Sequence, residues 1–253
     1  MSLFSGQGSV FNASRDGSGN PVDFAWAGNS PDTTVSLTTE NLEHKESYSG
    51  NRLTDARIVT ETSASIAITI DHFKEANFVL GLYGVAAAVS GGAIVDEPVL
   101  TTIPVVGERY ALKSTGRASA VSLEGNNVAI SNTLYDIDAS GVIVFSDITG
   151  IAAPITASYT NAASRRVGAF KTSAPERYTR VVSLNTATPT GSGDFSRRVF
   201  NAFRARYDPT ENLALINDEF ASMVLNGSIL ADTLRAQSDA GGQFLEMIDF
   251  DPA

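Results

Sequence analysis

Apolar and polar residues alternate with a period of two along several stretches of the chain, which is typical of β-strands with one buried face. Between residues 63 and 71, Ile66, Ile68 and Ile70 fall on the same face, and residues 33–42 and 176–188 show the same alternation. Valine, isoleucine and threonine, which favour strands, are plentiful. The pattern predicts a mainly β chain whose strands are antiparallel.

The period changes once, directly after Ile70. Apolar side chains there follow the spacing of an α-helix, at Phe73, Ala76, Leu80 and Tyr83. Asp71 is suited to the N-cap of that helix and Gly84 to its C-terminal stop. The sequence therefore predicts a single helix over about residues 72–83.

Short strands and frequent turn residues mark the middle of the chain, between residues 96 and 163. Gly125–Asn127 predicts a hairpin there, and Asn226–Gly227 predicts another near the end of the chain. We therefore expect residues 96–163 to form a small β insertion. The larger β domain would then comprise residues 1–95 and 164–253.

Charge is distributed unevenly along the 253 residues, whose net charge is −10. Residues 165–207 carry nine Lys or Arg against two acids, a net charge of +7, whereas residues 208–253 have a net charge of −8. These opposite blocks can neutralise each other within the fold or between copies of the chain. A strongly acidic chain is also a poor general binder of nucleic acid.

Composition narrows the possible chemistry further. The chain has no cysteine, which excludes disulfides and thiolate metal sites, and it has only two histidines. The first ten residues show no secretory signal pattern. The uncharged stretch of residues 78–95 is rich in Ala and Gly, so we interpret it as a helix end followed by a loop, not as a membrane span.

The most polar long stretch in the first half of the chain, EHKESYSGNRLTDARI, begins at Glu43 and ends at Ile58. His44, Ser47 and Glu46 are the residue types of a hydrolytic triad. Three residues of one loop seldom reach that geometry, because distant elements usually position catalytic groups. We therefore expect no enzyme activity, and we interpret the stretch as a charged loop between two strands.

A second stretch resembles a calcium-binding loop. Its matching positions are Asp136, Asp138, Ser140, Gly141 and Asp147. The flanking residues are typical of strands and not of helices, so a β-turn accounts for the pattern more simply. We expect neither a metal nor a cofactor.

Several longer segments, taken in order, carry a resemblance. They are LFSGQGSV and RDGSGNPVDFAWAGN near the start, LTTENLEHKESYSGNRLTDARI, FVLGLYG, ERYTRVVSLNTA, VFNAFRARYDP and LALINDEFASMVLNGSILAD. In this order and spacing they resemble the major tail tube proteins of long-tailed bacteriophages. The resemblance covers residues 1–85 and 175–245 and is looser in between.

The resemblance implies two packed antiparallel β-sheets, as a sandwich or barrel, with one flanking helix. It implies a structural virion protein whose copies join through sheet edges into rings, usually hexameric, that stack into a hollow tail tube around the tape measure protein. Tail terminator and distal tail proteins would be further partners, and DNA would pass through during ejection without specific binding. Assembly would take place in the cytoplasm of the host bacterium, with no membrane involved.

Two surfaces are candidates for contacts between subunits. The resemblance assigns inter-ring contacts to the charged loop, at Glu43, His44, Lys45, Glu46, Ser47, Tyr48, Arg52 and Asp55. Arg198, Arg204 and Arg206 share one face of a predicted strand and need a partner or solvent, because an unpaired buried cation is costly. We also expect a net negative lumen.

Other functions remain open at this point. The main alternative is a tail-tip, baseplate or adhesin-like β-sandwich that binds a partner and forms no long tubes. The tube proteins of type VI secretion systems are another alternative, although they are typically shorter. A hydrolase is the third.

Overall fold

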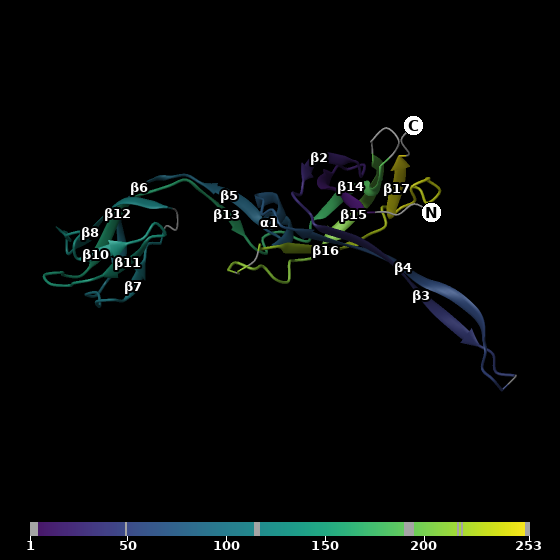
Figure 1. The fold of residues 1–253 in the computed structure, drawn as a ribbon. Helices are drawn as coiled ribbons and strands as arrows, with labels where there is room; N and C mark the ends of the chain where they lie inside the picture. Colours follow the sequence, from purple (N-terminus) through teal and green to yellow (C-terminus); the bar gives the residue numbers. More distant parts are fainter. Residues whose placement is uncertain are drawn as a thin grey trace. The chain divides into compact units, whose positions relative to one another are not determined.

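The computed structural model describes residues 5–48, 50–113, 117–189, 195–216, 218 and 220–250. The chain forms two compact units (Figure 1). The core unit comprises Met1–Val85 and Val167–Ala253, and the inserted unit comprises Ala86–Arg166. The inserted unit is longer than the expected insertion of residues 96–163 because it includes most of a two-stranded ribbon. That ribbon pairs β5 (Val85–Val89) with β13 (Ser164–Gly168).

The core unit is built on one large sheet. Its strands are β1 (Gly6–Arg15), β2 (Pro21–Trp26), β3 (Asp32–Lys45), β4 (Thr54–Ile70), β14 (Glu176–Pro189), β15 (Phe195–Tyr207), β16 (Met223–Ile229) and β17 (Leu245–Phe250). They follow the order β2-β1-β14-β15-β16-β4-β3, and β17 also pairs with β15. All of these pairings are antiparallel.

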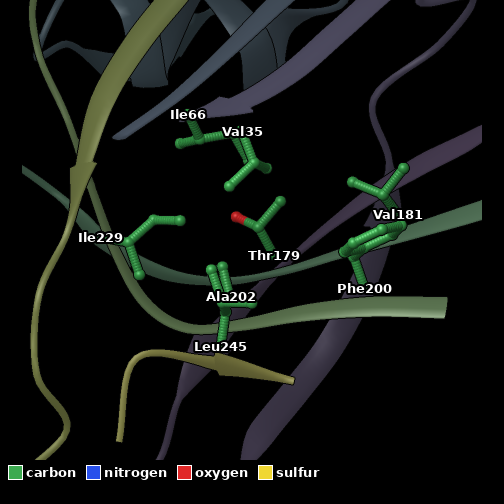
Figure 2. Close-up of a pocket in the computed structure, with 8 residues that line it drawn as sticks. All are labelled: Val35, Ile66, Thr179, Val181, Phe200, Ala202, Ile229 and Leu245. Atoms are coloured by element: carbon green, nitrogen blue, oxygen red, sulfur yellow. The ribbon is translucent and has the colours of Figure 1, made fainter. Parts of the chain in front are cut away.

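One edge of β15 pairs with two different strands, β16 and β17, and this divides the sheet into two layers. Residues 205–207 of β15 pair with β16, whereas residues 197–202 pair with β17. The inner faces of the two layers meet around an apolar cavity of about 10 Å³ (Figure 2). Its lining residues are Val35, Ile66, Thr179, Val181, Phe200, Ala202, Ile229 and Leu245. A space of that size holds about one water molecule, so the layers are closely packed.

The predicted fold class is confirmed: the chain is mainly β and antiparallel, with one α-helix in the described residues. The layers do not close into a barrel. Among the described residues, β2 and β3 each pair with a single neighbouring strand, and so does β17. These three strands therefore present open edges.

The apolar centre of the core unit contains the alternating isoleucines of β4. Ile66, Ile68 and Ile70 are buried, as their alternation predicts, and they pack in one cluster with Tyr207 and Leu225. Burying one such large side chain contributes about 1.5–3 kcal/mol. This cluster holds β4, β15 and β16 together and fixes the direction in which β4 leaves the core.

The prediction of a hairpin at Asn226–Gly227 is wrong. Gly227 lies inside β16, opposite Ile66 on one side and Tyr207 on the other. A Cβ at this position would lie only 2.6 Å from the backbone oxygen of Arg206. The glycine therefore serves the close approach of two strands, a role that local sequence does not distinguish from a turn.

The helix α1 spans Glu75–Gly81 and is shorter than the predicted 72–83. Its N-cap is Lys74, which has an extended backbone and makes no capping hydrogen bond through its side chain. Asp71, the predicted cap, instead accepts a hydrogen bond from the side-chain amide of Asn29. A contact with a distant loop thus replaces the local capping interaction.

The C-terminal end of α1 is a Schellman motif. Tyr83 occupies its left-handed position, with a φ of 50°, and the N–H of Gly84 donates to the carbonyl of Val79. Gly84, the predicted end of the helix, is therefore the residue that follows the left-handed residue Tyr83. The hydroxyl of Tyr83 donates to the carbonyl of Tyr207 at 2.7 Å, which holds the tyrosine in this conformation.

The inserted unit has its own sheets and its own apolar core. Its strands are β6 (Gly92–Leu100), β7 (Arg109–Ala111), β8 (Ala118–Gly125), β9 (Val128–Ala129), β10 (Tyr135–Ile137), β11 (Val142–Phe145) and β12 (Ile155–Asn161). They form a sheet in the order β6-β12-β8-β9 and another in the order β10-β11-β7. Phe145, Ile143 and Ile155 are fully buried at their centre.

The hairpin predicted at Gly125–Asn127 is confirmed. Gly125 pairs with Val128, and Asn126 and Asn127 both have positive φ, as a two-residue turn between twisted strands requires.

The uncharged stretch of residues 78–95 contains the end of α1, the whole of β5 and the start of β6. The expected loop is thus largely strand. None of the helices in the described ranges has the length and apolar character needed to cross a membrane.

Candidate functional site

The outer part of β3 and β4 forms a two-stranded arm, residues 37–63, that leaves the core unit (Figure 1). The last pair between β16 and β4 joins Ile229 to Ala64, so among the described residues the preceding part of β4 pairs with β3 alone. Nearly all described residues of the arm are exposed, so both of its faces are open to solvent in the isolated chain.

The stretch predicted to be a charged loop, residues 43–58, lies within this arm, and half of it is strand. Glu43 pairs with Arg57, and Lys45 pairs with Thr54, so only residues 46–53 form the connection. Strand preference depends strongly on the neighbouring strand. Pairing with β4 therefore outweighs the weak β-propensity of these charged residues.

The tip of the arm is held by contacts between its two ends. The backbone N–H of Glu46 donates to the carbonyl of Leu53 at 2.9 Å, and the Glu46 side chain is buried there. Lys45 and Arg52 are exposed at the same end. Neither makes an ion pair with another described residue, so the tip presents two unneutralised cations.

His44 contacts Asp55 and not Ser47. Its Nδ1 lies 2.6 Å from Oδ1 of Asp55, and both side chains are well exposed. Within the described residues, no hydrogen bond links His44 to the Ser47 hydroxyl. The residues of the hypothetical triad are thus not brought together, and the pair forms a polar contact on the arm surface.

Apolar side chains are exposed along the whole arm. Leu42 and Ile58 are direct cross-strand neighbours, and they are 62% and 63% exposed. The others are Leu37, Leu53, Val59 and Tyr48. Such a row of large apolar side chains on a projecting element is typical of a surface that another molecule covers.

The three arginines predicted to share a strand face differ in their surroundings. Arg204 donates two hydrogen bonds of 2.8 Å to the carboxylate of Glu176, and Arg198 pairs with Asp249 at 3.0 Å. Arg206 is exposed and makes no ion pair with another described residue. The first two cations are therefore neutralised within the chain, which leaves Arg206 as the candidate for an outside contact.

A partly buried charge cluster near Arg204 has no counterpart among the predictions from the sequence. Arg15 lies 2.7 Å from Asp232, whose side chain is only 2% exposed, and 3.8 Å from Glu176. The hydrogen bond from Arg204 holds the pKa of Glu176 below its ordinary value. These residues are far apart in the sequence, so no local pattern could have indicated the cluster. It joins β1, β14 and β15 to the segment that follows β16.

The calcium-like pattern in the inserted unit is a hairpin turn. Oδ1 of Asp138 accepts hydrogen bonds from the N–H and hydroxyl of Ser140 and from the N–H of Val142. These bonds, first of all that from the Ser140 hydroxyl, lower the pKa of Asp138. The part of the chain that the structure describes contains no group of three His, Cys, Asp or Glu side chains placed to hold a metal ion.

Comparison with known proteins gives one family. A family model described as "protein of unknown function UCP028589" matches residues 3–248, which is nearly the whole chain. A search of curated proteins finds no match.

Proposed function

Because the chain belongs to this family of proteins of unknown function, we propose its role from the surfaces it presents: it is the tail tube subunit of a long-tailed bacteriophage. Copies of the chain assemble into rings, usually hexameric in the tail tube proteins that the sequence resembles, and the rings stack into a hollow tube. The exposed apolar arm is the observation that supports this proposal, because both of its faces are exposed in the single chain and would be covered by surrounding copies.

The energetics of the arm favour a partner. Leu42 and Ile58 form an apolar pair on one face, and Val59, the next residue of β4, lies on the opposite face. Burying each such side chain against another subunit contributes about 1.5–3 kcal/mol. Several of these contacts per copy, repeated around a ring, offset the loss of rotational and translational freedom on assembly.

The open strand edges supply a second contact. β2 and β17 lie at opposite edges of one layer, and each carries exposed large side chains, among them Trp26, Phe24, Met247 and Phe250. Unpaired edges template further strands, and pairing two different edges gives a head-to-tail contact that closes into a ring. We propose that β17 of one copy meets β2 of the next.

The charge of the chain suits a conduit. Its net charge of −10 repels phosphate, and the paired arginines Arg198 and Arg204 are not free to bind it. In this proposal the tape measure protein occupies the lumen before ejection, and DNA then passes without specific binding. Tail terminator and distal tail proteins cap the two ends in the virion.

Gel filtration with light scattering tests the proposal on the purified protein. A tail tube subunit is expected to give particles of many subunits whose mass rises with concentration. A tail-tip, baseplate or adhesin-like binding module gives a monomer or one small oligomer of constant mass. That second result would remove the tube proposal.

A further inference from the structure

The connection between β15 and β16 comprises residues 208–222, of which the structure describes 208–216, 218 and 220–222. Its described part presents large apolar side chains to solvent. Leu215, Ile216 and Phe220 are 83%, 97% and 100% exposed. The segment is nevertheless anchored to the core unit: the N–H of Thr210 donates to the carbonyl of Gly81 at 2.7 Å, and Leu213 packs against the apolar core. The segment is thus anchored near its start and exposes apolar side chains farther along. We call residues 208–222 the acidic loop because of the charge described next.

All the charges of the acidic loop have the same sign. Its sequence, DPTENLALINDEFAS, contains four acids and no Lys or Arg. Asp208, Glu211 and Asp218 are exposed, and none of them forms an ion pair with another described residue. Apolar side chains and unneutralised carboxylates thus occur together on one segment.

The tip of the arm has the complementary character. Tyr48 and Leu53 are exposed apolar side chains, and Lys45 and Arg52 are exposed cations without an ion-pair partner among the described residues. One carboxylate of the tip, that of Glu46, is buried. At its outermost residues, 45–53, the tip therefore combines apolar surface with two exposed cations, whereas Glu43 and Asp55 lie farther back on the strands. The acidic loop combines apolar surface with negative charge.

The two surfaces lie at opposite ends of the longest strand. Thr54 at the tip begins β4, and Ile70 at its other end pairs with Met223, the residue that follows the acidic loop. A 17-residue strand extends about 55 Å at roughly 3.3 Å per residue. In Figure 1 the arm leaves the core unit on the side away from α1, beside which the acidic loop is anchored. One copy therefore cannot bring its own tip and loop together.

We propose that the acidic loop is the receptor for the arm tip of a second copy of this chain. This inference rests on the proposed tube function and names the surface that accepts the arm. Two different complementary patches form a heterologous contact, which closes into a ring or propagates along an axis, depending on the rotation between copies. Because these two patches lie at opposite ends of the longest strand, we propose that this contact propagates along the axis of the tube. Repetition of this contact stacks one ring on the next.

Charge reversal tests the contact on the full-length protein. The arm variant carries Lys45→Glu with Arg52→Glu, and the loop variant carries Glu211→Lys with Asp218→Lys. Each is expected to shorten the stacks at least tenfold in negative-stain micrographs, since each places like charges opposite one another. The quadruple variant, in which both signs are reversed, is expected to recover at least half of the wild-type length.

The matched control reverses two exposed cations of the inserted unit, Lys113→Glu with Arg117→Glu, and is expected to leave stack length unchanged. Circular dichroism of every variant establishes that the fold is kept. If the wild-type protein forms tubes but the loop variant stacks normally, or the quadruple variant fails to recover, the receptor assignment is overturned while the tube function stands. If the wild-type protein forms no rings at all, the proposed function fails and this inference fails with it.

Discussion

At the scale of single residues, Glu176 accepts two hydrogen bonds from the guanidinium of Arg204, and Arg15 adds a second cation 3.8 Å away. These contacts hold the pKa of Glu176 below its ordinary value of 4.5. The unfolded chain keeps the ordinary pKa, so Glu176 stabilises the fold fully above pH 4.5 and loses that contribution as the pH falls through the lower, folded-state pKa.

We predict that Glu176→Gln weakens this dependence on acid. The free energy of unfolding, measured by urea titration between pH 7 and pH 3, is expected to fall less steeply below pH 4.5 than in the wild type. At pH 7 the variant is expected to lose about 1 kcal/mol, since the pair is partly exposed. Equal slopes for the two proteins would contradict the assigned role.

Gly227 gives a second prediction at this scale. A methyl group there meets the backbone of β15, which cannot move without disturbing the core. Gly227→Ala is expected to lower the free energy of unfolding by about 1–3 kcal/mol. The control is Gly17→Ala, where a Cβ has no neighbour within 4 Å and the expected change is below about 0.5 kcal/mol. Equal effects would show that the close strand approach does not matter.

Local sequence could predict that Arg198, Arg204 and Arg206 need a partner or solvent, but not which partners they have. The register of β14 on β15 places Glu176 opposite Arg206, and the Glu176 carboxylate accepts its hydrogen bonds from Arg204, two residues away. That register depends on contacts between residues far apart in the sequence. For the same reason Asn226–Gly227 predicts a turn and proves to be part of a strand.

At the scale of elements, the arm accounts for both a correct and an incorrect prediction. The alternating residues on either side of it predict two strands, and both are present as β3 and β4. The charged stretch between them is predicted to be a loop, yet half of it, residues 43–45 and 54–58, is strand. Its residues favour strands only when a partner strand is already in place, which no short window of sequence shows.

Shortening the arm separates folding from assembly. Glu40 and Glu61 are direct cross-strand neighbours, so an Asn-Gly turn can replace residues 41–60 and close the hairpin there. Because the removed residues contribute nothing to the apolar core, Tm measured by circular dichroism is expected to stay within a few degrees of the wild type. Stacking is expected to be lost.

A truncated protein that still forms long stacks would contradict the role of the arm. A truncated protein that unfolds at a much lower temperature would instead show that the arm stabilises the core unit, although no residue of the arm belongs to the buried apolar cluster.

At the scale of the whole molecule, composition and periodicity sufficed for the fold class, since strand-favouring residues and period-two alternation recur along the chain. The two-layer arrangement depends on β15 sharing one edge between β16 and β17. That division follows from pairings between residues far apart in the sequence, so the periodicity of a single strand does not contain it.

The two charge blocks are expected to neutralise each other either within the fold or between copies of the chain, and the structure shows only partial neutralisation within the fold. Part of the opposite charge is neutralised within the chain, as in the pair of Arg198 with Asp249. Asp208, Glu211 and Asp218 of the acidic block make no ion pairs among the described residues. Neither do Lys45 and Arg52 of the arm tip, which lie outside the basic block, at the other end of β4. This remaining charge is available for contacts between copies.

The central claim is that this chain assembles with itself into a tube, and electron micrographs of the purified protein test it most directly. Negative-stain images at several concentrations are expected to show rings with a central hole and stacks of such rings, longer at higher concentration. Separate particles of one small size at every concentration, without rings, would contradict the account.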